Sequence, residues 1–153
     1  APIRIRGKWG FIDKRETIKV QPKYDSVLAF RNGLSTVVKS GLYGLVDRDG
    51  NVELAPEYES IIPLENGGFV IVRDGKKGLA NQHGRSLFWP RFDEVYDLDN
   101  GSVIVERNHH FGLMGLDGSS PIPMIYNALI YDPFRQLYLA ELPGEPFEVK
   151  SGN

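Results

Sequence analysis

Few side chains of this sequence are candidates for catalysis or metal binding, and they are isolated from one another. His109 and His110 are adjacent and are candidates to bind a metal ion or move a proton, but adjacent residues of a strand point to opposite faces. The only other histidine is His83. We therefore expect no metal site.

Paired carboxylates are a second possible source of catalysis. Asp97 with Asp99, and Asp47 with Asp49, each share one face of a strand. The two acids of a glycosidase must face each other across a cleft, and Asp-x-Asp beside a turn glycine is typical of a solvated loop. No serine has a histidine context, no glycine spacing matches a phosphate-binding loop, and there is no cysteine. We expect no catalytic residue and no cofactor.

The strongest regularity of the chain is a period of 34 residues, kept by a glycine, an aromatic residue and the acid or amide after that aromatic. The three sets are Gly10, Gly44, Gly78 and Gly112; Tyr24, Tyr58, Phe92 and Tyr126; and Asp25, Glu59, Asp93 and Asn127. Such a period is typical of stacked units that bury their apolar faces against one another. We expect one repeat domain over 1–153, with an N-terminal edge strand 1–6, repeats at about 7–40, 41–74, 75–108 and 109–142, and a tail at 143–153.

Two turn signals alternate between these positions. They are Asn32-Gly33, Asn66-Gly67 and Asn100-Gly101, and then Asp49-Gly50, His83-Gly84 and Asp117-Gly118. Asn-Gly and Asp-Gly tolerate the positive φ angles of a type I′ turn, so we expect hairpins. The short strands between them, such as 35–39, 43–47, 52–55 and 59–63, number three or four per unit. The predicted fold is all-β, with antiparallel meanders stacked as an open, twisted, solenoid-like array; a small closed β-propeller is the alternative.

The residues around the repeated glycine form a signature of two linked motifs. Segment 7–13 (GKWGFID) recurs as 41–47 (GLYGLVD) and 75–81 (GKKGLAN), and 22–25 (PKYD) recurs as 56–59 (PEYE) and 90–93 (PRFD). Together they resemble the bacterial WG repeat, also called the KWG repeat, over nearly the whole chain to about residue 140. The resemblance implies a protein that binds other proteins, with some members placed beside toxins in a pattern that suggests immunity or adaptor roles. It implies no catalytic motif.

Each repeated position has a structural reason. Glycine in a strand is found where another backbone or a ring lies close, and we expect that clearance between stacked units. The proline of the second motif forbids a central ladder bond and should mark a bend between strands. We also expect three rings to pack on neighbouring units and three polar side chains to bond their own turns. These are Trp9, Tyr43 and Phe111, and Asp13, Asp47 and Asn81.

Departures from the repeat are better candidates for function. Trp89 stands where other units have Gln21, Ala55 and Pro123. A large aromatic near an arginine, here Arg91, is a composition favoured at interface hot spots, although a place in the core is equally open for Trp89. The candidates for partner binding are Trp89, Arg91, His109 and His110.

Charge is uneven along the chain, whose net charge is −2. Residues 1–34 hold eight bases against three acids, and residues 35–68 hold two bases against six acids. No dense basic run with interleaved aromatics favours nucleic acid, and no apolar run is long enough to span a membrane. The start at Ala1 fits a removed secretory leader or a cut from a longer chain. A periplasmic or secreted bacterial location is therefore favoured over the cytoplasm.

These features predict a non-enzymatic protein-binding module with an immunity or adaptor role. One alternative is a carbohydrate or envelope-polymer binder, whose aromatic faces would stack on sugar rings. The other is a structural segment of a larger multidomain protein.

Overall fold

The computed structural model describes residues 1–65, 67–142 and 147–151, and these residues form strands and turns with no helix. The strands make five antiparallel sheets, which we label A to E in chain order. Sheet A holds β1 (Pro2–Ile5), β2 (Lys8–Ile12) and β3 (Ile18–Tyr24); sheet B holds β4 (Ser26–Val27), β5 (Leu34–Lys39), β6 (Leu42–Asp47) and β7 (Val52–Tyr58); sheet C holds β8 (Ser60–Pro63), β9 (Phe69–Arg73), β10 (Lys76–Ala80) and β11 (Ser86–Phe92); sheet D holds β12 (Glu94–Asp97), β13 (Ser102–Arg107), β14 (His110–Gly115) and β15 (Ile122–Tyr126); sheet E holds β16 (Ala128–Asp132), β17 (Leu137–Glu141) and β18 (Phe147–Ser151).

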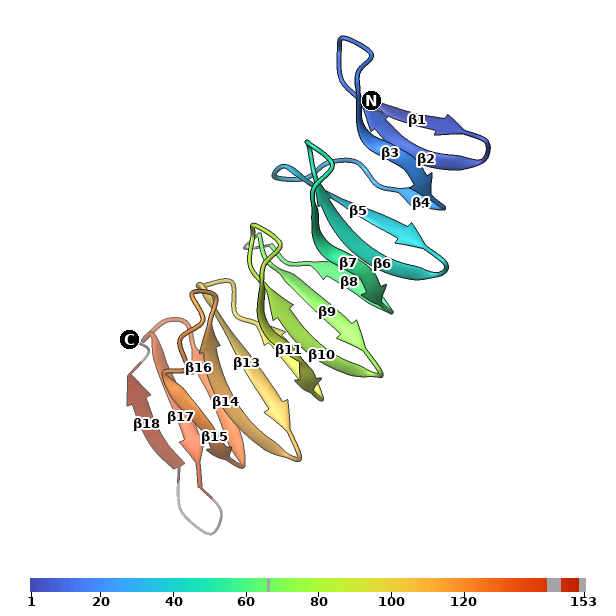
Figure 1. Cartoon of the computed structure of the whole chain (residues 1–153). Helices are drawn as coiled ribbons and strands as arrows, with labels where there is room; N and C mark the ends of the chain where they lie inside the picture. The colour runs from blue at the N-terminus through green and yellow to red at the C-terminus, as the bar shows by residue number, and fades with distance from the viewer. Residues whose placement is uncertain (66, 143–146, 152–153) are drawn as a thin grey trace.

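The five sheets stack in a row as an open, twisted array, with sheets A and E at its two ends (Figure 1). Consecutive strands of a sheet are neighbours, so each sheet is a meander. The prediction of an open all-β repeat array is confirmed. The alternative of a closed propeller would need the first and last sheets to meet, and they lie far apart (Figure 1).

The core is divided into four apolar layers, one between each pair of adjacent sheets. Phe11, Val20 and Tyr24 of sheet A meet Val37 and Val46 of sheet B in the first layer. The other three layers repeat this arrangement between B and C, C and D, and D and E. Each inner sheet therefore buries both faces, as expected for units that are stable only when stacked.

One residue joins each sheet to the next. The last strand of a sheet and the first strand of the following sheet are separated only by Asp25, Glu59, Asp93 or Asn127. The backbone N–H of each of these residues donates to a carbonyl of the following sheet, as from Asp25 to Val38 at 2.8 Å and from Asp93 to Glu106 at 2.8 Å. Sheets thus change at the repeated acid or amide, half a unit away from the repeat boundaries read from the sequence. The residues assigned to the tail supply β18, which pairs with β17.

The tightest hairpins are not the ones that the sequence predicted. They join the second and third strands of a sheet, or β1 and β2, through Arg6-Gly7, Ser40-Gly41, Asp74-Gly75 and Asn108-His109, where both residues have positive φ. The type I′ prediction is right for Asn32-Gly33. It is wrong for Asp49-Gly50, Asn100-Gly101 and Asp117-Gly118, where the residue before glycine has no positive φ. These turns and His83-Gly84 nevertheless join paired antiparallel strands, so the prediction of hairpins is right. Asn66 lies outside the described residues.

The repeated glycine faces a bulge in the neighbouring strand of its own sheet. Lys77 pairs with Phe92 and Leu79 with Phe88, so Trp89, Pro90 and Arg91 together oppose the single residue Gly78. A Cβ on Gly78 would lie 2.6 Å from the Phe88 carbonyl oxygen and 2.6 Å from the Pro90 nitrogen. The expected close backbone approach is present, but within one sheet and not between stacked units.

The same bulge corrects the role assigned to proline. Pro22, Pro56 and Pro90 lie inside β3, β7 and β11, at the bulge, and do not mark a bend between strands. These strands are at sheet edges, where a residue without an N–H costs no ladder bond. In sheet D the bulge of β15 covers Gly112 in the same way.

Candidate functional site

Each bulge presents two side chains whose identity changes from unit to unit. The repeated glycine lies against each bulge, and a proline fixes its backbone in sheets A, B and C, where sheet D has Met124. The residues on either side of this position project from an edge strand. The pairs are Gln21 and Lys23, Ala55 and Glu57, Trp89 and Arg91, and Pro123 and Ile125, and all eight are exposed. We call these eight residues the bulge row. Bulges commonly redirect side chains for a functional purpose, so this row is the first candidate site.

Trp89 is the largest side chain of the bulge row, and 62% of its surface is exposed. This places it outside the core, which the sequence left open. Arg91 lies two residues further along β11, with its guanidinium carbon 5.0 Å from the centre of the Phe92 ring. The ring of Phe92 is buried, so it holds the arginine stem while the charge remains in water. Trp89 and Arg91 therefore form one exposed aromatic and cationic pair.

The two candidate histidines lie at the tip of the β13–β14 hairpin. His109 is a turn residue with φ +64° and His110 begins β14, so they do not alternate along one strand as expected. His110 Nδ1 lies 3.1 Å from the Asn108 carbonyl oxygen. Among the described residues, no hydrogen bond, ion pair or ring contact joins either histidine to Trp89 or Arg91.

Asp93 connects the hairpin tip to the end of β11. Its carboxylate accepts hydrogen bonds from the Lys76 ammonium and from the Asn108 N–H, the latter at 3.0 Å. The Lys76 hydrogen bond, then the Asn108 bond and the nearby Lys76 and His109 charges, hold the pKa of Asp93 below its ordinary value. His109 follows Asn108 in this turn and therefore lies near Asp93, which is two residues beyond Arg91 in the chain.

The same acid arrangement recurs at the first junction. Asp25 accepts from the Lys8 ammonium and from the Ser40 N–H, the latter at 2.7 Å, and these two bonds lower its pKa. Lys8 begins β2 of sheet A, whereas Ser40 lies in the hairpin turn of sheet B. We call this arrangement of one acid holding two consecutive hairpins the acid clip. It stabilises the stack and offers no open carboxylate for catalysis.

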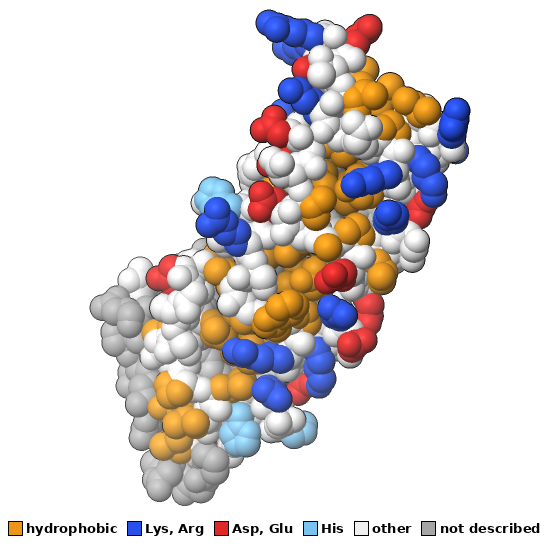
Figure 2. All heavy atoms as spheres, in the orientation of Figure 1, with side chains coloured by type: hydrophobic (Ala, Val, Ile, Leu, Met, Phe, Trp, Pro, Cys, Tyr) orange, Lys and Arg blue, Asp and Glu red, His pale blue; other side chains and the backbone are white. Residues whose placement is uncertain are grey.

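The surface of the array carries an apolar band. Figure 2 shows hydrophobic side chains gathered along the length of the array, with Lys and Arg side chains on the side where the tight hairpins lie. A second apolar row repeats at 34-residue intervals on the opposite edge strands, or directly after the strand for its first member: Leu28, Ile62, Tyr96 and Ile130, each about half exposed. The molecule thus offers long surfaces on its edge strands.

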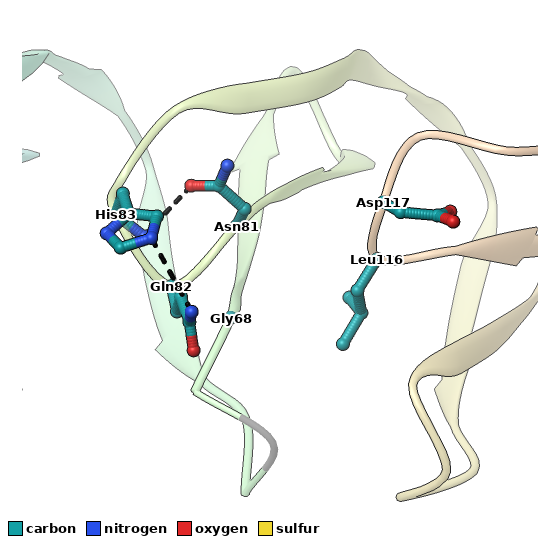
Figure 3. A pocket seen from close by; sticks show the side chains of 6 residues that line it. All are labelled: Gly68, Asn81, Gln82, His83, Leu116 and Asp117. Carbon is teal, nitrogen blue, oxygen red and sulfur yellow. Dashed lines mark hydrogen bonds between the residues drawn. The ribbon is translucent and has the colours of Figure 1, made fainter.

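Clefts between the turns of adjacent sheets are a second candidate site. The cleft between sheets C and D has a volume of about 270 Å³ and is lined by Gly68, Asn81, Gln82, His83, Leu116 and Asp117 (Figure 3). Asn81 Oδ1 accepts from the His83 N–H at 2.9 Å, and Asp117 points away from both residues. Similar clefts separate A from B and B from C. Their recurrence follows from the spacing of turns in a stack, and their polar groups bond within the turns.

The carboxylates considered for catalysis hold loops together. Asp47 Oδ1 accepts from the N–H groups of Asp49 and Asn51, each at 2.9 Å, and Asp97 Oδ1 accepts from Asp99 at 3.0 Å. Asp13 and Asn81 bond their turns in the same way, as predicted. Over the part of the chain that the structure describes, no three His, Asp or Glu side chains gather as a metal site would need.

The predicted ring packing holds for two of the three aromatics. Tyr43 packs on the layer between sheets B and C, and Phe111 packs on the layer between D and E. All three rings are half-buried, but Trp9 belongs to none of the four apolar layers and instead lies under Arg4, whose guanidinium carbon is 5.8 Å from the ring.

The sequence profile described as "WG containing repeat" matches residues 9–43 and 43–77. Residues 9–77 therefore match two tandem copies of this repeat. The glycine, the proline and the bulge that they share recur in sheet C beyond the matched segment. No curated protein matches the chain.

Two solved structures resemble the array weakly. One is the extracellular domain of the putative one component system BT4673 from B. thetaiotaomicron, at 11% identity and a TM-score of 0.38 over 96% of this chain and 25% of that one. The other is KlHsv2 with loop 6CD replaced by a Gly-Ser linker, at 9% identity and a TM-score of 0.41 over 99% of this chain and 60% of that one. The chain therefore spans less than two thirds of either protein. No described helix has the length and apolarity of a membrane span.

Sequence reasoning selected Trp89 and Arg91 as candidates but missed other exposed groups. The Leu28, Ile62, Tyr96 and Ile130 row keeps the same period as the glycines, so an alignment of the units would have found it. Phe134, in the turn before β17, is almost fully exposed. Nothing in its local sequence indicates that exposure.

Proposed function

We propose that this WG-repeat array is a non-enzymatic protein-binding module that contacts its partner through Trp89 and Arg91. The observation that supports the proposal is the exposure of Trp89 on a bulge whose backbone is fixed by Gly78 and Pro90. A rigid aromatic loses little conformational entropy when it is buried by a partner, and tryptophan and arginine are the residues most enriched at hot spots.

His109 and His110 form the outer part of the proposed contact. His109 follows Asn108, whose N–H donates to Asp93, and Asp93 is two residues beyond Arg91 in the chain. We assign these histidines to the rim, where charge affects the association rate more than the affinity. More specifically, we propose an adaptor or immunity role, because both roles require binding to one protein partner and no catalysis.

The test is capture of partners from a lysate of the source organism, followed by binding measurements with the purified partner. We expect one stoichiometric protein, with affinity reduced at least tenfold by the double variant Trp89→Ala, Arg91→Ala, because hot-spot truncations cost about 2 kcal/mol or more. The matched control is Gln21→Ala, Lys23→Ala, which changes the same two bulge positions in sheet A. Equal effects of the two double variants would contradict this choice of site.

A carbohydrate partner is the second candidate, since an exposed tryptophan ring also stacks on sugar rings. Binding on a glycan array that Trp89→Ala abolishes, together with no protein partner, would replace the first proposal. Binding to neither class would leave the array as a structural segment.

A further inference from the structure

The outer face of sheet A is apolar at positions that are buried in every following sheet. Ile3 is the counterpart of Val37, Ile71 and Val105, all of which are fully or almost fully buried against the preceding sheet. Ile12 is the counterpart of Val46 and Ala80, which are also buried there. In sheet A these isoleucines point away from sheet B and remain partly exposed. The first sheet therefore carries an interface face with nothing packed on it in the described residues.

A third isoleucine extends this face at a position where the other units have a lysine or an arginine. Ile5 is 43% exposed and occupies the position of Lys39, Arg73 and Arg107. Isoleucine and arginine alternate along β1. Arg4 lies over Trp9 on the side toward sheet B, so the isoleucines on either side of it occupy the free end.

The opposite end of the array is also apolar. Leu139 pairs with Ile130, as Val70 pairs with Ile62 and Ile104 with Tyr96 in the two preceding sheets. Val70 and Ile104 are buried by the following sheet. Leu139 and Leu137 are partly exposed on this outer face, and Ile130 is 52% exposed. Terminal units of repeat arrays normally have polar outer faces that keep the array soluble.

We propose that copies of this chain stack head to tail, with the outer face of sheet E of one copy packed on the outer face of sheet A of the next. The contact continues the layer geometry already formed between sheets A to E within one chain. The two end segments also have opposite net charges, which would steer their encounter: residues 1–34 hold eight bases and three acids, whereas residues 120–153 hold four acids and two bases. Two different faces in contact make a heterologous interface, which grows into open assemblies.

The first measurement is the mass of the purified chain in solution across a wide range of concentrations, by sedimentation velocity. Mass that rises with concentration beyond two copies is expected. A monomer at every concentration, including the highest at which the chain stays soluble, would overturn the proposal.

Two end variants then test which faces meet. Ile5→Lys, combined with Ile3→Lys, blocks the sheet A end, and Leu139→Lys blocks the sheet E end; each variant is expected to be monomeric. Mixed in equal amounts, they are expected to give a complex of two copies and no more, because each retains one intact end. Self-association of the sheet E variant alone would indicate contact between two sheet A faces and would also overturn the proposal.

Val52→Lys is the matched control, because Val52 is an exposed apolar residue of β7 away from both ends. It should associate like the wild type. Circular dichroism and thermal melting confirm that each variant is folded before its mass is interpreted. Trp89→Ala, Arg91→Ala should leave the mass distribution unchanged, so failure of this proposal and failure of the proposed function are distinguishable.

Discussion

Two of the four junctions between sheets carry an acid clip and two do not. Asp25 with Lys8 clips A to B, and Asp93 with Lys76 clips C to D. Between B and C the lysine position holds Leu42, which cannot pair with Glu59. Between D and E the corresponding residues are His110 and Asn127. The junctions nevertheless have the same backbone bond across the joining residue and the same kind of apolar layer.

The comparison separates the contacts that every junction has from the ion pair that only two junctions have. The clip residues are exposed, with 48% of the Lys76 side chain and 36% of the Asp93 side chain in contact with solvent. Exposed ion pairs contribute little, because water screens them and both side chains lose freedom. The buried leucines and the covered glycines are common to both kinds of junction. They should therefore contribute more than the clip to the free energy of unfolding at every junction, with or without a clip.

The largest effect is expected from Gly78→Ala in sheet C, and an equal effect from Gly44→Ala in sheet B. The new methyl group would meet backbone atoms of the bulge in each case, at 2.6 Å for Gly78 and 2.5 Å for Gly44. Backbone cannot rotate away as a side chain can, so we expect a loss of about 3 kcal/mol or more in the free energy of unfolding. Urea denaturation followed by tryptophan fluorescence measures it.

The control for these variants is Gly75→Asn in the β9–β10 turn. Gly75 has φ +73° and open space around it, and the equivalent turn residue in sheet D is already a side chain, His109. Asparagine tolerates this conformation, so the cost should stay below about 1 kcal/mol. A similar loss for Gly75→Asn and Gly78→Ala would show that backbone conformation, and not the bulge, is what the repeated glycine supplies.

The second prediction compares the apolar layers through one leucine per junction. Leu45, Leu79 and Leu113 are 0% exposed, lie 34 residues apart and face the layers B–C, C–D and D–E. Each Leu→Ala change should cost about 2 to 5 kcal/mol, and the three values should agree within about 1 kcal/mol. Chemical denaturation of the three variants provides the comparison. A loss at Leu79 well below the other two would mean that the clip supports its junction.

The sequence predicted the features that follow from its 34-residue period. Regular recurrence of glycine and of the aromatic residue, such as Gly44 with Tyr58, indicates stacked units of equal size, and the turn residues indicate β-structure. The bulge was not predictable, because Gly78 and Pro90 lie in different strands and their contact appears only once the register is known. Whether Trp89 lies in the core or on the surface was not predictable for the same reason, because a bulge breaks the alternation of inward and outward residues.

The acid clip could have been predicted from the sequence, but it was missed. Lys8 precedes Asp25 by 17 residues, and Lys76 precedes Asp93 by the same interval, whereas Leu42 stands in the unit between them. Aligning units pairwise would have shown that the lysine appears with aspartate and not with Glu59. Three tight hairpins were missed because Arg6-Gly7, Ser40-Gly41 and Asn108-His109 lack the Asn-Gly or Asp-Gly pair that marks such turns. The fourth, Asp74-Gly75, is such a pair and could have been predicted.

The third prediction concerns the clip alone. Asp93→Asn keeps an acceptor for the Asn108 N–H but removes the charge that holds Lys76. We expect a small fall in melting temperature, well below that of Leu79→Ala, which also diminishes as salt is added. Glu59→Gln, the equivalent change at a junction without the lysine, should leave the melting temperature unchanged. Equal falls for the two variants would show that the acid acts through its backbone neighbours and not through a clip.

The smallest effect is the pH dependence that the clip adds. The Lys76 hydrogen bond lowers the pKa of Asp93 from its ordinary value of 3.8, so the native state binds this proton less readily than the unfolded chain. The stabilisation is then complete above about pH 3.8 and is lost as the pH falls through the lowered pKa. The stability of the wild type and of Asp93→Asn should therefore differ most near neutral pH and converge in acid. Urea denaturation of both proteins from neutral pH into acid tests this. A difference that stays constant over that range would mean that the ionised carboxylate is not what distinguishes a clipped junction from an unclipped one.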